Sequence, residues 1–344
     1  MARFEDKPGE NVLNPTKWEI ERIINFDLDH CWESMFSHLG FHGRSGQQFV
    51  LGHYNNWIGE IDGPGTLKWT AGAEPVVGSE RHINVNLPSP LYISEAPDGA
   101  ILVSCYRDSN IYKIDPGKGT ANLFINGNKL GFKDIGNCIF DQNDNIWVNE
   151  VFGCQIWQFD LEGNPLMTLG GEPCFQSEDV PLEEAQFSNI FDIRPGPDGN
   201  IYILDAGNFA VRMIDLSNGK VSLIAGTGLS GYSGDDGDAR LATFGHTAGE
   251  PLDGPLSISL DENCNIFIGD TQNHAVRMVD RTTGIISTIA GDTTTQYDTR
   301  NDQSEKDPFK LNLQKINSMD YYDGHLFIPK AKGDLIIMVK QRSK

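Results

Sequence analysis

The sequence predicts an all-β fold, a six-bladed β-propeller, and three observations predict it. The first is an internal repeat. Residues 201–226 contain three short runs rich in β-branched and aromatic residues, separated by Gly, Asn and Asp turns, and residues 266–291 repeat the same order. Such runs are typical of strands joined by hairpins. One three-stranded unit cannot bury both of its faces, so repeated units of this size predict an array.

The second observation is that the same frame recurs along the whole chain. The six copies begin their second strands at Phe49, Ile101, Ile146, Ile201, Ile266 and Leu326. A further strand that ends in a polar turn, such as Pro97-Asp-Gly99, precedes these copies. Four strands in each of six units, with turns rich in Gly and Asp, are the sequence signature of a propeller.

The third observation concerns the two ends of the chain. The last copy stops after Val339 without an outer strand, whereas residues 18–26 form a strand-like segment with no blade before it. We expect the N-terminal strand to complete the last blade, because closure of the ring removes free sheet edges. The chain is then one propeller domain, 1–344, with blades at about 30–72, 88–127, 134–170, 187–226, 253–291 and 314–340.

Three stretches carry a resemblance to a known repeat. They are Arg212-Met-Ile-Asp215, the Gly- and Asp-rich segment 224–244, and the strand that ends at Asp261. Together they resemble NHL repeats in their longer, Gly-rich form. The resemblance implies a six-bladed propeller but no single activity, since the repeat occurs in lyases, sensor domains, RNA-binding proteins and protein-interaction modules.

Charge and cysteine content exclude some classes of partner. Lys+Arg of 27 against Asp+Glu of 48 gives a net charge of −21, which opposes binding to nucleic acid and to anionic membranes. No signal peptide or membrane span is legible. The six cysteines occur singly, which predicts free thiols and a cytoplasmic protein, although a mature exported form lacking its signal would look similar.

The candidate site lies at one mouth of the central channel. In a propeller the innermost strand begins, and the second strand ends, on the same face of the disc. The residues at the second-strand ends are His53, Cys105, Glu150, Asp205, Asp270 and Lys330. A purely structural array would carry Asp or Asn each time, and four of the six positions depart from that.

Histidine, thiol, carboxylate and lysine that face one funnel are suited to general acid–base catalysis or to metal binding. The segment His30-Cys-Trp-Glu33 adds a histidine and a carboxylate where the first inner strand is entered. The predicted catalytic residues are therefore His30, Glu33, His53, Cys105, Glu150 and Lys330. The alternative is a solvated rim whose side chains have changed without gaining a function.

The predicted substrate-binding residues are Tyr106, Arg107, Asp205 and Asp270. Arg107 would bind an anionic group through two parallel hydrogen bonds, unless it is an ordinary exposed turn arginine. Arg212 and Arg277 on the next strands favour instead a structural ion pair for the two aspartates.

The sequence leaves a metal site open. A divalent metal would bind at His30, at His53 or at the more remote His82, His246 and His274, but the histidine spacing matches no known zinc pattern, and we interpret His274 as structural. Asp141–Asn145 and Asp261–Asn265 resemble the start of a calcium loop, but both lack the following Gly and the distant Glu, so we interpret them as Asx turns.

Two functions follow from these residues. The first is a soluble small-molecule enzyme, a lyase, isomerase or hydrolase, which predicts a deep pocket at the channel axis that binds the ligand. The second is a scaffold for a protein partner, which predicts a contiguous apolar patch on the disc face. The loops 226–255 and 292–312 would either cover the funnel or lie on the surface.

Overall fold

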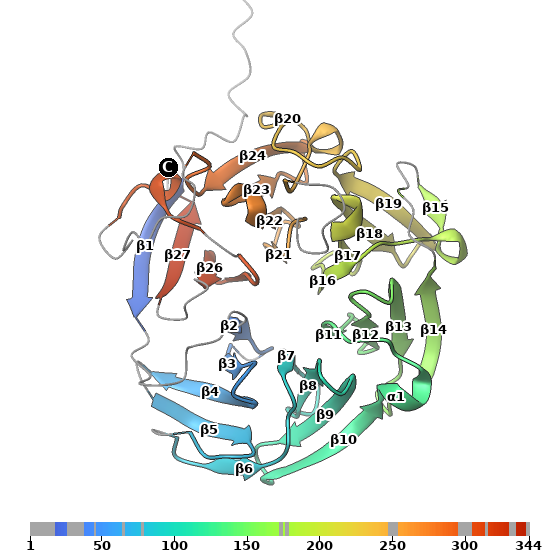
Figure 1. Ribbon diagram of the computed structural model, residues 1–344, viewed down its shortest axis with the longest axis vertical. Coiled ribbons are helices and arrows are strands. Elements are labelled where there is room, and N and C mark those ends of the chain that lie inside the picture. Colours follow the sequence, from blue (N-terminus) through green and yellow to red (C-terminus); the bar gives the residue numbers. More distant parts are fainter. Residues whose placement is uncertain are drawn as a thin grey trace, which may run out of the picture.

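The protein is a closed ring of six sheets around one axis, as the computed structural model shows (Figure 1), and their strand pairs are antiparallel except for β5 and β6, which run parallel. The structure describes residues 18–25, 38–44, 46–63, 66–76, 79–171, 175, 179–246, 254–294, 305–313, 316–329 and 335–341. The all-β, six-bladed prediction is thereby confirmed.

The blades follow the chain, from the axis outward. Blade 1 contains β2 (His38–His42), β3 (Gln48–Gly52), β4 (Trp57–Gly63), β5 (Thr66–Gly72) and β6 (His82–Asn84). Blade 2 contains β7 (Pro90–Glu95), β8 (Ile101–Cys105), β9 (Asn110–Asp115) and β10 (Thr120–Asn126), and blade 3 contains β11 (Cys138–Phe140), β12 (Ile146–Asn149), β13 (Gln155–Phe159) and β14 (Pro165–Gly170).

Blade 4 contains β16 (Ile190–Pro195), β17 (Ile201–Asp205), β18 (Ala210–Asp215), β19 (Lys220–Ala225) and the short edge strand β15 (Val180–Pro181). Blade 5 contains β21 (Ser257–Leu260), β22 (Ile266–Asp270), β23 (Ala275–Val279), β24 (Ile285–Ala290) and the edge strand β20 (Gly237–Asp238). Blade 6 contains β25 (Asp320–Tyr322), β26 (His325–Pro329), β27 (Leu335–Gln341) and β1 (Trp18–Asn25). The described helical elements are α1 (Gly127–Leu130), η2 (Leu182–Glu184), η3 (Ala206–Asn208), η4 (Ala239–Leu241), η5 (Thr271–Asn273) and η7 (Pro308–Lys310).

The two ends of the chain close the ring, as predicted. β1 pairs antiparallel with β27, and the register places Trp18 opposite Gln341 and Asn25 opposite Leu335. A strand from the start of the chain therefore forms the outer edge of the last blade (Figure 1).

The second strands are almost continuous apolar runs because they are covered on both faces. All five residues of β8, of β17 and of β22 are buried, and their side chains pack against the neighbouring blades. The turns that precede these strands in blades 3 and 5 are Asx turns. Asp141 Oδ1 accepts hydrogen bonds from the backbone N–H groups of Asn143 and Asn145, at 2.8 and 2.9 Å. The Asp261 turn has the same pattern.

A buried carboxylate at the axis joins several blades. Asp192, on the inner strand β16, accepts hydrogen bonds from Arg194 Nε at 2.9 Å and from the backbone N–H of Ile258 at 2.9 Å. Asn137 Nδ2 donates to the same carboxylate. Asp192 is 3% exposed, so these bonds form in a low-dielectric interior where each is strengthened.

The guanidinium of Arg194 extends this network to two more blades. It donates to the Tyr92 hydroxyl at 2.9 Å in blade 2 and to the Met319 carbonyl at 3.2 Å beside blade 6. Its planar fork also lies over the Tyr92 ring, 5.2 Å from the centroid. One ion pair therefore contacts five of the six blades.

The described part of the first long loop does not cover the channel. Residues 226–246 pack at the outside of blade 5, where β20 pairs with β24 and Asp235 forms a 2.8 Å ion pair with the buried Arg277. Residues 247–253 and 295–304 lie outside the described residues.

We predict that Asp192→Ala lowers the free energy of unfolding by about 3–5 kcal/mol, because it leaves a buried guanidinium without its counter-ion. Asp192→Asn keeps the size of the side chain, so it is expected to lower the free energy of unfolding by a smaller amount. Urea unfolding followed by circular dichroism measures both. The control is Lys118→Ala, which breaks an exposed pair with Asp115 and is expected to change nothing measurable. Equal effects of Asp192→Ala and Lys118→Ala would contradict the role given to this network.

Candidate functional site

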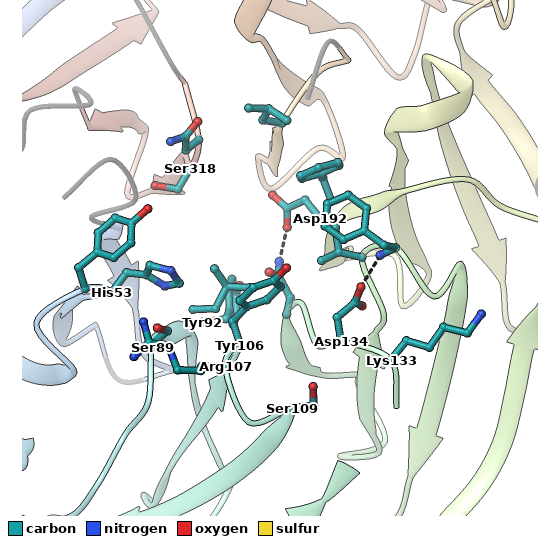
Figure 2. A pocket seen from close by; sticks show the side chains of 18 of the residues that line it. His53, Ser89, Tyr92, Tyr106, Arg107, Ser109, Lys133, Asp134, Asp192 and Ser318 are labelled. Carbon is teal, nitrogen blue, oxygen red and sulfur yellow. Dashed lines mark hydrogen bonds between the residues drawn. The ribbon is translucent and has the colours of Figure 1, made fainter. Parts of the chain in front are cut away.

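A cavity of about 640 Å³ opens at the axis, on the face where the second strands end (Figure 2). The segments that follow β3, β8 and β12 contribute seven of its residues: His53, Tyr54, Tyr106, Arg107, Ser109, Val151 and Phe152. The starts of the inner strands and the segments before them contribute most of the rest, including Lys133 and Asp134. The cavity therefore lies at the mouth that the sequence predicts.

His53 is held against the wall of this cavity as a neutral imidazole. Its Nδ1 lies 3.1 Å from the Pro90 carbonyl oxygen, which can only accept, so Nδ1 carries the proton and Nε2 is the basic nitrogen. Burial lowers the pKa of His53 from its ordinary 6.5, and the nearby Arg107 charge lowers it further, against the raising effect of the Pro90 hydrogen bond. The rings of Tyr54 and Tyr106 flank it, with centroids at 4.9 and 6.4 Å.

Asp134 lies on the other side of the cavity (Figure 2). Its Oδ2 accepts a hydrogen bond from the Phe152 backbone N–H at 2.8 Å, whereas Oδ1 is buried and has no hydrogen-bond partner among the described residues. Burial raises the pKa of Asp134, more than the backbone N–H groups of residues 151–153 lower it. A buried oxygen of this kind is costly unless a ligand or water satisfies it.

Aromatic side chains form one part of the rim. Tyr54, Tyr106 and Phe152 are exposed and follow the ends of β3, β8 and β12. In the equivalent turns of blades 4 and 5 the chain has Ala206-Gly207 and Thr271-Gln272, without an aromatic residue. The exposed aromatic side chains of the rim therefore follow the second strands of blades 1 to 3.

The structure places Cys105 outside the cavity. Its side chain is fully buried within blade 2, and burial raises the pKa of the thiol well above its ordinary value. A thiol in that state is a packing group and a poor nucleophile. The four described cysteines, Cys105, Cys138, Cys154 and Cys264, are all buried and free, as predicted.

Glu150 also lies outside the cavity lining, and its carboxylate accepts one backbone and one side-chain hydrogen bond. Oε2 accepts the Lys133 N–H at 2.8 Å, and Oε1 accepts the indole N–H of Trp157 at 2.8 Å. Trp157 stands on β13 opposite Val148, two residues before Glu150. The residue pair Glu150–Trp157 thus takes the place that an Asp–Arg pair occupies in the next two blades.

Asp205 and Asp270 have structural roles, as the arginines on the next strands indicate. Asp205 accepts the Ser188 N–H at 2.7 Å and lies 3.7 Å from Arg212 Nη1. Asp270 accepts the Gly245 N–H at 2.9 Å and lies 3.9 Å from Arg277. All four side chains are fully buried away from the cavity.

Of the predicted site residues, the structure brings together His53, Tyr106 and Arg107. Cys105, Glu150, Asp205 and Asp270 are buried in their blades instead. His30, Glu33 and Lys330 lie outside the described residues, so their catalytic roles stay predictions.

The prediction did not include Lys133, Asp134 or the axial residues Tyr92, Asp192 and Arg194 among the site residues. Alternation along β16 places Asp192 and Arg194 on one face of the strand, and two charged side chains at alternate positions of an otherwise apolar inner strand were the available signal. For the rim, the signal was an aromatic residue in a turn where the copies in blades 4 and 5 carry Ala-Gly or Thr-Gln.

Metal binding gains no support from the described geometry. Among the described residues, no group of three or more His, Cys, Asp and Glu side chains has an arrangement that could hold a metal ion. The helices in the described part of the chain are all too short or too polar to cross a membrane.

No family model matches the chain, so the NHL repeat stays a resemblance. A stretch of 138 residues, 38% of the chain, is 28% identical to Protein SUPPRESSOR OF QUENCHING 1, chloroplastic, from Arabidopsis thaliana, and spans 12% of that protein.

Solved structures share the propeller fold. An auxiliary nutrient-binding protein from Bacteroides thetaiotaomicron has a TM-score of 0.64 at 13% identity, over 95% of this chain and 77% of that one. A catalytically inactive virginiamycin B lyase variant from Staphylococcus aureus, solved with quinupristin, has a TM-score of 0.53 at 14% identity, over 88% and 80%. A gluconolactonase from Xanthomonas campestris has a TM-score of 0.54 at 12% identity, over 94% and 98%. At these identities the similarity establishes the fold alone.

We predict that Glu150→Ala destabilises the fold without changing the cavity. Each of the two partly buried N–H groups that it leaves without an acceptor costs up to about 1–3 kcal/mol. Thermal and urea unfolding measure the loss, and Glu162→Ala, at an exposed turn, is the matched control. A stable Glu150→Ala protein that has lost ligand binding would restore Glu150 to the site.

Proposed function

We propose that this protein is a small-molecule enzyme of the lyase, isomerase or hydrolase type, and that its chemistry takes place in the axial cavity. One observation carries the proposal. A histidine held in its neutral form and a buried carboxyl group with an unsatisfied oxygen line the same cavity of about 640 Å³. That volume suits an organic molecule of ordinary ligand size.

His53 is the proposed general base. The Pro90 hydrogen bond fixes the tautomer, so that Nε2 can take a proton from a substrate C–H group or from water. Asp134 is the proposed partner: its Oδ1 hydrogen-bonds a substrate donor and, in the protonated form that burial favours, can return a proton. Elimination, isomerisation and hydrolysis all need this pair of functions.

The comparisons support the class of reaction and no single substrate. Structures named as a lyase and as a lactonase share the fold, and both names describe reactions on small molecules. A screen for turnover therefore begins with aldonolactones and with quinupristin.

We predict that His53→Gln lowers kcat for any substrate found in that screen by about 10²–10⁴-fold, because it removes the base while an amide can still donate to the Pro90 carbonyl. His325→Gln is the matched control, since His325 begins β26 and does not line the cavity. If both variants turn over the substrate at the wild-type rate, His53 is not the base.

The pH dependence gives a second prediction. His53 acts only when neutral, and its pKa lies below 6.5. We expect kcat/KM to be constant at neutral pH and to fall as the pH drops through that lowered value, since protonation then removes the base. A steady-state profile from about pH 4.5 to about pH 8, which brackets the ordinary histidine range, measures it. An acidic limb with a midpoint above 6.5 would be inconsistent with this assignment.

The exposed aromatic rim favours a second candidate, a scaffold for a protein partner. Tyr54, Tyr106 and Phe152 are exposed together beside the cavity, and aromatic residues are enriched at interfaces. Turnover that depends on His53 would favour the enzyme over the scaffold.

A further inference from the structure

The two ends of the channel differ in charge. A second cavity, of about 810 Å³, lies at the opposite end, between the inner-strand turns, and shares Tyr92 and Arg194 with the first. The acidic residues that line it are Glu95, Asp141, Asp144, Asp261, Glu262, Asp320 and Asp323. Among the described lining residues, only Arg44 and Arg194 offset them there.

The cavity at the His53 end has the opposite balance of charge, with more basic than acidic residues in its lining. Its charged lining residues are Arg107, Lys133, Asp134, Asp192 and Arg194. Because Asp192 and Arg194 form an ion pair, the remaining charges are those of Arg107, Lys133 and Asp134. In a chain of net charge −21, an excess of cations in a cavity is a local reversal that attracts anions.

Two cations of this lining, Arg107 and Lys133, form no ion pair with a carboxylate among the described residues. Arg107 follows β8, whereas Lys133 lies on the side of the cavity away from His53 (Figure 2). Figure 2 places Arg107 on the His53 side of the cavity, and its charge contributes to the lowered pKa of His53. By contrast, many other described basic residues have a carboxylate partner: Arg44, Lys68, Lys113, Lys118, Arg194, Arg212, Arg277 and Lys310.

The cavity also provides an apolar wall. Leu91, Val151, Phe152, Phe191 and Leu256 line it, and the rings of Phe152 and Phe191 meet edge to face at 5.9 Å. A ligand that contacts both this wall and Arg107 needs an apolar body and an anionic end.

We propose that the cavity binds an amphipathic organic carboxylate, with the carboxylate on the Arg107 guanidinium beside His53 and the apolar body against the Phe152–Phe191 wall. This rests on the proposed function in that the cavity is taken as the active site. A carboxylate matches the planar fork of an arginine in two parallel hydrogen bonds. A single negative charge also meets less repulsion from the rest of this acidic protein than a dianion does. The acidic cavity repels the same ligand, so it enters from the His53 end.

The experiment compares two probes that differ only in charge, 4-phenylbutyrate and 4-phenylbutanamide. Their binding to the full chain is measured by isothermal titration calorimetry at low salt. We expect the wild-type protein to prefer the carboxylate by about 10- to 100-fold, as for a charge-assisted hydrogen bond. Arg107→Gln is expected to abolish that preference. Lys220→Gln, at an exposed lysine on β19 that does not line the cavity, removes the same charge and is expected to keep it.

Equal binding of the two probes, binding of neither, or a preference that persists in Arg107→Gln would overturn the proposal. Unfolding midpoints of the variants confirm that each is folded; Arg107 is an exposed residue, so its replacement is expected to leave the midpoint unchanged.

The His53→Gln variant separates this proposal from the proposed function. It is expected to keep the carboxylate preference while losing turnover. A carboxylate preference in a protein whose turnover does not depend on His53 would refute the catalytic assignment and leave the anion site standing. Turnover that depends on His53, with probes bound equally, would refute the anion site alone.

Discussion

The ion pair between Asp192 and Arg194 at the axis is the interaction on which the geometry of the cavity depends. In a propeller the inner strands approach one another only at the centre, where few backbone groups are available to pair between blades. Here one carboxylate and one guanidinium supply those contacts, with partners in blades 2, 3 and 5 and beside blade 6. Because burial makes an unpaired charge so costly, the pair fixes the distances between inner strands and closes the floor of the cavity.

The ends of the second strands show how one structural position is filled in different ways. In blades 4 and 5 an aspartate accepts a loop N–H and faces an arginine on the next strand. In blade 3 the longer Glu150 reaches an indole N–H instead. In blade 2, where Cys105 holds the position, Asp108 accepts from the Tyr112 hydroxyl of the facing strand. The departures from Asp are compensated within each blade, so a changed residue at this position does not by itself mark catalysis.

Blade 1 differs in its register. Its hairpin closes at the Gly52–Trp57 pair, whereas that of blade 4 closes at Asp205–Ala210, so His53 is the first residue of the turn. The imidazole is satisfied by the Pro90 carbonyl of the next blade, which orients the ring along the cavity wall. The position of His53 at the cavity therefore comes from its place in this turn and from the Pro90 carbonyl that holds it.

The sequence by itself determined the fold. The repeat in residues 201–226 and 266–291, the turn residues and the unpaired strand at 18–26 defined six closed blades, since strand periodicity and turn chemistry are local properties. It also placed the candidate site at the mouth where the cavity opens, and it included His53, Tyr106 and Arg107. Only the tertiary structure decided that Glu150 and Cys105 are buried within their blades and that Asp134, Lys133 and the Asp192–Arg194 pair line the cavity. Whether a side chain packs in its blade or reaches the axis depends on its neighbour across the sheet and on the next blade, and those contacts join residues up to 125 positions apart.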